Sequence, residues 1–220
     1  FGIGVHLVRF SPDESHEQQA DEMLELVEMA DRAGFEIVWS TEHHGHEHIV
    51  GPNALTLLVH FAPYTKQIRL GTAVIVAPYW HPLRLAGEVA MTDLLTKGRL
   101  EVGIARGAFQ YEFDRMLGGI PQEQGGAHLR ESIPAIKKLW AGDYEHNGEI
   151  WQFPRATSVS KPVQKPHPPL WAAARSPQTF DFAVKEDMDI MTTPHRLPMS
   201  EVVSLKDKLE RAVADNPGHK

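Results

Sequence analysis

IRLGTAVIVAPYWHPLRLAGEVAMTDLLTKGRLEVGIA, residues 68–105, is the stretch that decides the fold class. It joins an apolar run over residues 68–76, an amphipathic run over residues 82–96 and a second apolar run over Leu100–Ala105. Proline at the first helical position and Gly98 just beyond the last one are the usual start and stop signals of a helix. The stretch therefore predicts a strand, a helix and a second strand parallel to the first, as in a parallel sheet built from βα units.

The same alternation runs along the whole chain. Further strands are predicted over residues 3–8, 36–40, 170–174 and 189–192, and further helices over residues 20–33, 53–64, 128–140, 179–185 and 200–214. These segments make about six βα units, whereas a closed (β/α)8 (TIM) barrel has eight. We expect an α/β fold of the TIM (β/α)8 barrel type, with residues 1–220 as a single β/α barrel domain that lacks its C-terminal βα units. An open doubly wound sheet is the alternative, but the G-x-G-x-x-G fingerprint after its first strand is absent.

Composition narrows the class of protein. A chain of 220 residues with 42% hydrophobic content can bury one core. Its 22 basic and 29 acidic residues give a net charge of −7, which argues against nucleic-acid binding. The lack of cysteine excludes disulfides and thiolate metal sites and fits a reducing compartment. With no signal-peptide pattern and no long apolar span, we expect a cytoplasmic protein that makes no use of a membrane.

Polar side chains gather directly after the predicted strands. Residues 41–48 read TEHHGHEH and follow the second strand, Arg106 follows the fourth, and Arg175 and Ser176 follow the fifth. Parallel β/α folds place their active sites at this edge, where the loops after the strands converge. Residues 107–124 and 144–168 read as long irregular segments, and such segments are usually functional.

The histidine cluster has three interpretations. His43, His44, His46 and His48 could chelate a metal ion in a barrel hydrolase, although later strand ends supply no further ligands. One histidine could instead act as a general acid or base near neutral pH. The third interpretation is a set of solvated loop residues without a role.

Ser176-Pro177-Gln178-Thr179 predicts the start of a helix that can bind an anion. The free N–H groups of such a start, assisted by the hydroxyls of Ser176 and Thr179, suit a phosphate, and Arg106 from across the rim could complete the site. An ordinary capped helix and a surface arginine fit these residues equally well. Aromatic residues near strand ends could wall a pocket for a flat ring or belong to the core: Trp39, Trp80, Trp171, Phe109 and Tyr111.

A set of segments in a fixed order carries a family resemblance. It comprises residues 34–39 (GFEIVW) leading to Glu42-His43-His44, then 68–74 (IRLGTAV), 81–84 (HPLR), 93–100 (DLLTKGRL) and 103–107 (GIARG). Together these segments resemble the luciferase-like family of flavin-dependent monooxygenases, especially its bacterial luciferase α-type branch. The resemblance spans nearly the whole chain.

The resemblance implies a β/α barrel that binds FMNH2, the reduced form of FMN, supplied by a separate flavin reductase. Reaction with O2 would give a C4a-hydroperoxyflavin that oxygenates an apolar organic substrate such as an aldehyde. A homodimer or heterodimer is also expected. The family further includes F420-dependent oxidoreductases, which leaves F420 as an alternative cofactor. A metal-dependent hydrolase and a non-catalytic flavin-binding subunit are the alternatives outside this activity.

The resemblance also assigns roles to particular residues. His43 matches the catalytic histidine, which acts as an acid or base. Arg106, Ser176 and Thr179 match phosphate-binding positions. Arg175 departs from luciferase, which has an acidic residue there, and is expected to add a phosphate contact. Ala73-Val74 falls where relatives carry a non-prolyl cis peptide under the flavin ring.

Overall fold

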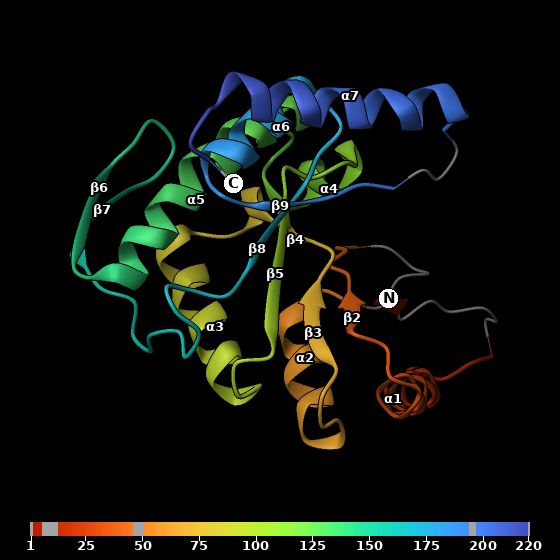
Figure 1. Cartoon of the computed structure of the whole chain (residues 1–220). Helices are drawn as coiled ribbons and strands as arrows, with labels where there is room; N and C mark the ends of the chain where they lie inside the picture. The colour runs from red at the N-terminus through yellow and green to blue at the C-terminus, as the bar shows by residue number, and fades with distance from the viewer. Residues whose placement is uncertain (1, 6–12, 46–50, 194–196, 220) are drawn as a thin grey trace.

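A parallel sheet forms the centre of the molecule. The computed structural model describes residues 2–5, 13–45, 51–193 and 197–219. Within these residues the strand order is β1-β2-β3-β5-β8-β9, with β4 beside β5, and all of these neighbours are parallel (Figure 1). The strands are β1 (Gly2–Val5), β2 (Ile37–Ser40), β3 (Arg69–Thr72), β4 (Ile75–Val76), β5 (Leu100–Ala105), β8 (Leu170–Ala173) and β9 (Asp189–Met191). This sheet is the expected partial β/α barrel.

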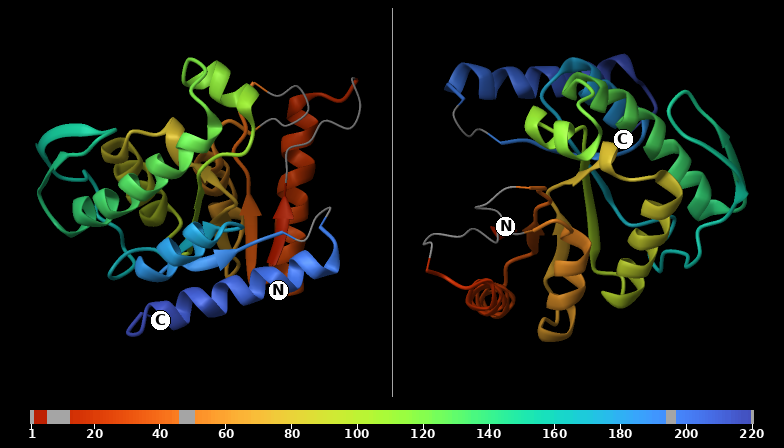
Figure 2. Two further views of the ribbon diagram at one scale, coloured as in Figure 1. Left: turned by 90° about the horizontal axis from the view of Figure 1, so that it is seen from above. Right: turned by 180° about the vertical axis from the view of Figure 1, so that it is seen from behind.

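Helices alternate with the strands. Figure 1 shows α2, α3 and α5 along one side of the sheet, and Figure 2 shows α6 and α7 side by side. The long helices are α1 (His16–Ala33), α2 (Ala54–Phe61), α3 (Pro82–Leu95), α5 (Gly125–Ala141), α6 (Pro177–Lys185) and α7 (Met199–Asp215). Single 3-10 turns lie at Ala62–Tyr64, Ala77–Tyr79 and Gln122–Gln124. Each predicted helix is therefore present.

The two faces of the sheet differ. Strand residues such as Leu70, Val102 and Ile104 are buried in one cluster with helix residues such as Leu58 and Ile136. On the opposite face Trp39 and Trp171 meet edge to face, with 5.3 Å between ring centroids. Trp171 also donates its indole N–H to Glu101 at 2.7 Å. In a closed barrel this second face lines the interior, because successive strand residues point alternately to helices and lumen.

Several predicted boundaries were wrong. The third strand is two strands, β3 and β4, separated by the expected cis peptide between Ala73 and Val74. Residues 107–124 are not wholly irregular, because they contain α4 (Gln110–Met116), a short helix without a side-chain cap. Residues 144–168 contain the hairpin of β6 (Tyr144–Asn147) and β7 (Gln152–Ala156). The hairpin was not predicted because β7 contains Pro154, and proline is unusual within a strand. Residues 6–8 of the first predicted strand lie outside the described residues.

Asp31 near the end of α1 is a buried carboxylate that holds the turn before β3. Its oxygens accept the backbone N–H groups of Lys66, Gln67 and Ile68 at 2.9, 3.0 and 2.8 Å. Burial raises the pKa of this carboxyl, but the three N–H donors and Arg99 outweigh burial and hold the pKa below its ordinary value. The ionised carboxylate therefore stabilises the fold.

Asp31→Asn is expected to lower the free energy of unfolding at pH 7 by about 1–3 kcal/mol, because one amide oxygen replaces two charged acceptors. Since the folded pKa is depressed, the contribution of Asp31 is present above the unfolded value of about 3.9 and is lost as pH falls through the folded value. Urea unfolding at pH 7 and below about pH 3 measures the difference. Asp143→Asn, at an exposed pair with Arg155, is the control. A difference between Asp31→Asn and the parent that is the same at both pH values would contradict the assignment.

Candidate active site

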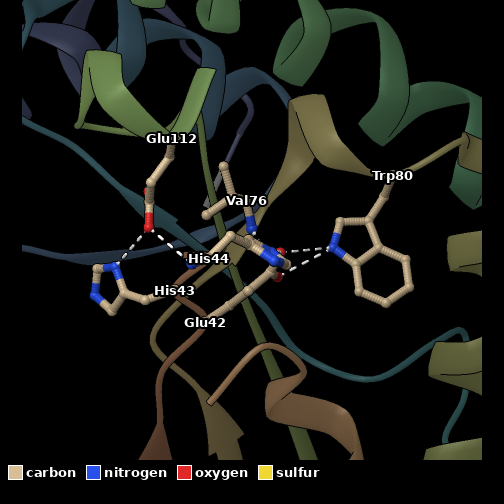
Figure 3. A network of polar contacts seen from close by, with 6 residues as sticks. All are labelled: Glu42, His43, His44, Val76, Trp80 and Glu112. Carbon is tan, nitrogen blue, oxygen red and sulfur yellow. Dashed lines mark hydrogen bonds and ion pairs between the residues drawn. The ribbon is translucent and has the colours of Figure 1, made fainter. Parts of the chain in front are cut away.

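A buried carboxylate, that of Glu42, links the loop after β2 to β4 by a hydrogen bond. Glu42 is 2% exposed. It accepts the backbone N–H of Val76 at 3.1 Å and the indole N–H of Trp80 at 3.0 Å, and it pairs with Nε2 of His44 at 2.7 Å (Figure 3). Trp80 is therefore a buried partner of the loop. Glu42 fixes the path of residues 42–44 at the end of the strands.

A second buried carboxylate meets the same loop from α4. Oε1 of Glu112 lies 3.1 Å from Nδ1 of His43 and accepts the backbone N–H of His44 at 2.9 Å (Figure 3). Burial raises the pKa of the Glu112 carboxyl, but the hydrogen bonds from His43 and His44 outweigh burial and hold the pKa below its ordinary value. Glu112 is therefore ionised at neutral pH.

Other residues of α4 close over this loop. Arg115 donates from Nη1 to the carbonyl of Gly45 at 2.5 Å. Phe109, just before α4, has its ring centroid 5.7 Å from that of His43 and stacks on Tyr111 at 5.4 Å. Phe109 and Tyr111 thus form an aromatic edge beside His43, and their role as walls of a pocket for a flat ring stays a prediction.

A pocket lies at the ends of β5 and β8. These strands are neighbours, so Arg106 and Ser176, which follow them, lie at the same edge of the sheet. The pocket has a volume of about 710 Å³. Its lining includes the basic residues Arg106, Arg130 and Lys185 and the acidic residues Glu123 and Asp181. The hydroxyl residues Ser176 and Thr179 and the helix residue Gly126 also line it.

Two helices begin at this pocket. Gly126 belongs to the first turn of α5, and residues 176–179 form the start of α6. Ser176 caps α6 by accepting the N–H of Thr179 at 3.3 Å, and the two hydroxyls are 3.0 Å apart. The positive dipole end of α6, the hydroxyls of Ser176 and Thr179 and three cationic side chains favour an anion such as a phosphate. The donor set therefore fits the phosphate group of a flavin nucleotide.

The structure brings most of the predicted site residues to one edge of the sheet. Arg106, Ser176 and Thr179 share the pocket, and His43 lies on the loop after β2. Arg175 is exposed and does not line this pocket, although it precedes Ser176 directly. Its phosphate contact stays a prediction, as does the flavin contact of Ala73 and Val74, which are partly exposed between β3 and β4.

Sequence reasoning missed three residues. Arg130 and Lys185 line the pocket from within α5 and α6, and Glu112 reaches His43 from α4. None of them follows a strand directly, whereas the site residues were predicted from their positions just after strands. Only Arg130 could have been found from the sequence, because it lies near the start of a predicted helix, where a cation can reach an anion bound at the helix start.

Gly125→Ala is expected to disturb the pocket. A Cβ atom at Gly125 would lie 2.0 Å from the carbonyl oxygen of Arg106, so the Arg106 segment or α5 must shift. Such overpacking costs about 1–3 kcal/mol of stability and should weaken flavin binding. Gly142→Ala at the other end of α5, where a Cβ meets nothing within 4 Å, is the matched control. Thermal unfolding and FMN titration of both variants measure the effects; unchanged values for Gly125→Ala would contradict the predicted clash.

The described residues contain no group of three or more His, Asp or Glu side chains arranged to hold a metal ion. His43 and His44 pair instead with Glu112 and Glu42. His46 and His48 lie outside the described residues. Among the helices that the structure describes, none is both long and apolar enough to cross a membrane.

Fold and site together define a β/α-barrel type of protein with a pocket lined by arginine and lysine side chains at the carboxyl ends of its strands. The family model described as luciferase-like monooxygenase matches residues 2–216. The chain belongs to this family.

Individual relatives agree with this assignment. The chain is 48% identical over 205 residues to the oxygenase component of a flavin-dependent trigonelline monooxygenase from Acinetobacter baylyi, covering 93% of the chain and 57% of the relative. Among solved structures, the monooxygenase RslO1 from Streptomyces bottropensis has a TM-score of 0.89 at 30% identity, over 99% of this chain and 68% of that one. The oxygenating constituent of 3,6-diketocamphane monooxygenase from Pseudomonas putida, in complex with FMN, has a TM-score of 0.87 at 19% identity, over 100% and 63%. The chain thus spans a little over half the length of the trigonelline relative.

Proposed function

We propose that this protein is the oxygenase of a two-component, FMNH2-dependent monooxygenase that uses O2 to oxygenate a small organic molecule. The observation that carries the proposal is the pocket that joins Arg106, Arg130 and the start of α6 at the end of β5. The cationic side chains of this pocket support the binding of a phosphorylated cofactor. The loop with His43 accounts for an acid or base at the same edge of the sheet.

In this proposal the pocket residues bind and orient. Arg106 and Arg130 would pair with the phosphate, and the start of α6, with the hydroxyls of Ser176 and Thr179, would donate hydrogen bonds to its remaining oxygens. Ala73 and Val74, joined by the cis peptide, would hold the flavin ring. When bound, the reduced flavin would supply the two electrons that activate O2.

His43 then holds or releases the proton that oxygen transfer requires. It lies beside Phe109, and the ring of Phe109 stacks on Tyr111. Aromatic side chains limit the access of water, which favours oxygen transfer over release of hydrogen peroxide. Catalysis therefore depends on three tasks of the chain: phosphate binding, proton transfer and exclusion of water.

A separate flavin reductase is part of the proposal, because the Acinetobacter relative is named as an oxygenase component. A homodimer or heterodimer is also proposed. It would cover Met91, Leu94 and Leu95 of α3, which are 46%, 49% and 49% exposed. The substrate expected from the sequence is an apolar aldehyde. Trigonelline, the substrate named for the Acinetobacter relative, is the polar alternative.

The test mixes the intact protein, loaded with FMNH2 without oxygen, with ¹⁸O2 and either a medium-chain aldehyde or trigonelline. The proposal predicts one ¹⁸O atom in the product of one substrate, with less hydrogen peroxide than FMNH2 releases alone. Reduced F420 that is oxidised by hydride transfer without O2 uptake would favour the alternative activity of the family. FMN binding with unchanged peroxide release for both substrates would favour a non-catalytic flavin-binding subunit.

A further inference from the structure

Two buried carboxylates hold two neighbouring histidines through different atoms. Glu42 contacts the ring of His44 at Nε2 and also serves Val76 and Trp80. Glu112 contacts the ring of His43 at Nδ1. Figure 3 shows the carboxylate of Glu112 pointing between His43 and His44 from α4. The two rings are therefore oriented independently of each other.

The charge of Glu112 determines which atom carries the proton. Its side chain is 1% exposed, and the carboxyl pKa lies below its ordinary value although burial raises it. An ionised carboxylate can only accept hydrogen bonds. Nδ1 of His43 must therefore be the donor across the 3.1 Å contact, and in the neutral ring the lone pair is then at Nε2.

Neighbouring groups leave this assignment intact. Burial, Glu112 and Glu42 raise the pKa of Tyr79, and burial and Glu112 raise that of Tyr111, so both phenols are neutral at physiological pH. The ring of His44 is held by Glu42. Arg115 lies on the exposed side of α4 and bonds the carbonyl of Gly45. The charge nearest to Nδ1 of His43 among these groups is thus that of Glu112.

We propose that Glu112 is a positioning residue that fixes His43 as the Nδ1–H tautomer and thereby presents Nε2 as the proton acceptor. In this arrangement Nε2 takes a proton from the reacting group, Glu112 stabilises the resulting imidazolium, and the same proton is later returned, so no net proton is consumed. The catalytic consequence rests on the proposed function. The tautomer does not, because it exists without flavin or oxygen.

The first test observes the tautomer directly. The intact protein is labelled with ¹⁵N in its histidine rings, and its 13 histidines are resolved by comparison with a His43→Asn variant. The proposal predicts that His43 has a protonated Nδ1 and an unprotonated Nε2 above neutral pH. An Nε2–H form of His43 in the parent protein would overturn the proposal whatever cofactor the protein uses.

The second test removes the carboxylate. Glu112→Leu, which cannot accept either hydrogen bond, is expected to shift His43 toward the Nε2–H form and to lower the rate of oxygenation about 10²-fold, with FMNH2 affinity within about threefold. Glu112→Gln keeps an acceptor oxygen and should retain the Nδ1–H form with a smaller loss, about tenfold.

Arg115→Ala is the matched control, because it removes a separate hydrogen bond from α4 to this loop, at the carbonyl of Gly45. It should leave the tautomer unchanged and the rate within about threefold. An unchanged tautomer and rate in Glu112→Leu would overturn the proposal, as would an equal rate loss in Arg115→Ala. If Glu112→Leu does not fold, the tautomer in the parent and in Glu112→Gln decides.

Discussion

His43→Asn is expected to lower the turnover of oxygenation by about 10²–10⁴-fold, the range for loss of a general acid or base. Asparagine cannot exchange a proton near neutral pH, but it matches the Nδ1 end of the ring in size and polarity. Its amide can still donate to Glu112, whose carboxylate lies 3.1 Å from Nδ1 of His43. The loop should therefore keep its conformation, and the loss should appear in turnover.

The effect is measured by stopped-flow mixing of the FMNH2-loaded protein with O2 and by quantifying product and hydrogen peroxide separately. FMNH2 affinity should stay within about threefold, since His43 is not in the phosphate pocket. His60→Asn, at an exposed histidine on α2, is the control. Turnover in His43→Asn within a few-fold of the parent would remove His43 from the catalytic role.

Arg106→Ala is expected to weaken FMN binding by about 10–150-fold, which corresponds to about 1.5–3 kcal/mol for a charged hydrogen bond. Arg106 follows β5 and lines the pocket opposite the start of α6. Because the side chain is exposed, part of its attraction is screened, and the effect should decrease as salt concentration rises.

Riboflavin separates the phosphate contribution from that of the flavin ring, because it lacks the phosphate. Its affinity should be the same in Arg106→Ala and in the parent, so the preference for FMN over riboflavin should decrease by the same factor as the FMN affinity. Arg155→Ala, at an exposed pair with Asp143, is the control for a general loss of positive charge. Equal weakening of FMN and riboflavin would mean that Arg106 acts on the fold or on the ring rather than on the phosphate.

The sequence predicted the sheet because its strands are apolar runs separated by well-marked helices. The unit over residues 68–105 has proline at its helix start and Gly98 at its end, and both elements are present. Arg106, Ser176 and His43 were found for a related reason. Parallel strands bring residues that follow them to one edge, so their proximity could be inferred without knowing any side-chain contact.

Residues on short or weakly marked helices could not be found in this way. Glu112 is 69 positions from His43 and belongs to α4, whose start has no side-chain cap. Its contact with His43 depends on how α4 packs over the loop after β2, which local periodicity does not encode. Arg130 and Lys185 likewise reach the pocket through the orientation of α5 and α6.

The measurement that tests the central claim most directly is an anaerobic titration of the intact protein with FMNH2, reduced riboflavin and reduced F420. The account predicts saturable binding of FMNH2 that is at least about tenfold tighter than that of reduced riboflavin, with the difference reduced in Arg106→Ala, and weaker binding of F420. No saturable binding of FMNH2, or equal affinities for FMNH2 and riboflavin, would contradict a flavin phosphate site between α5 and α6.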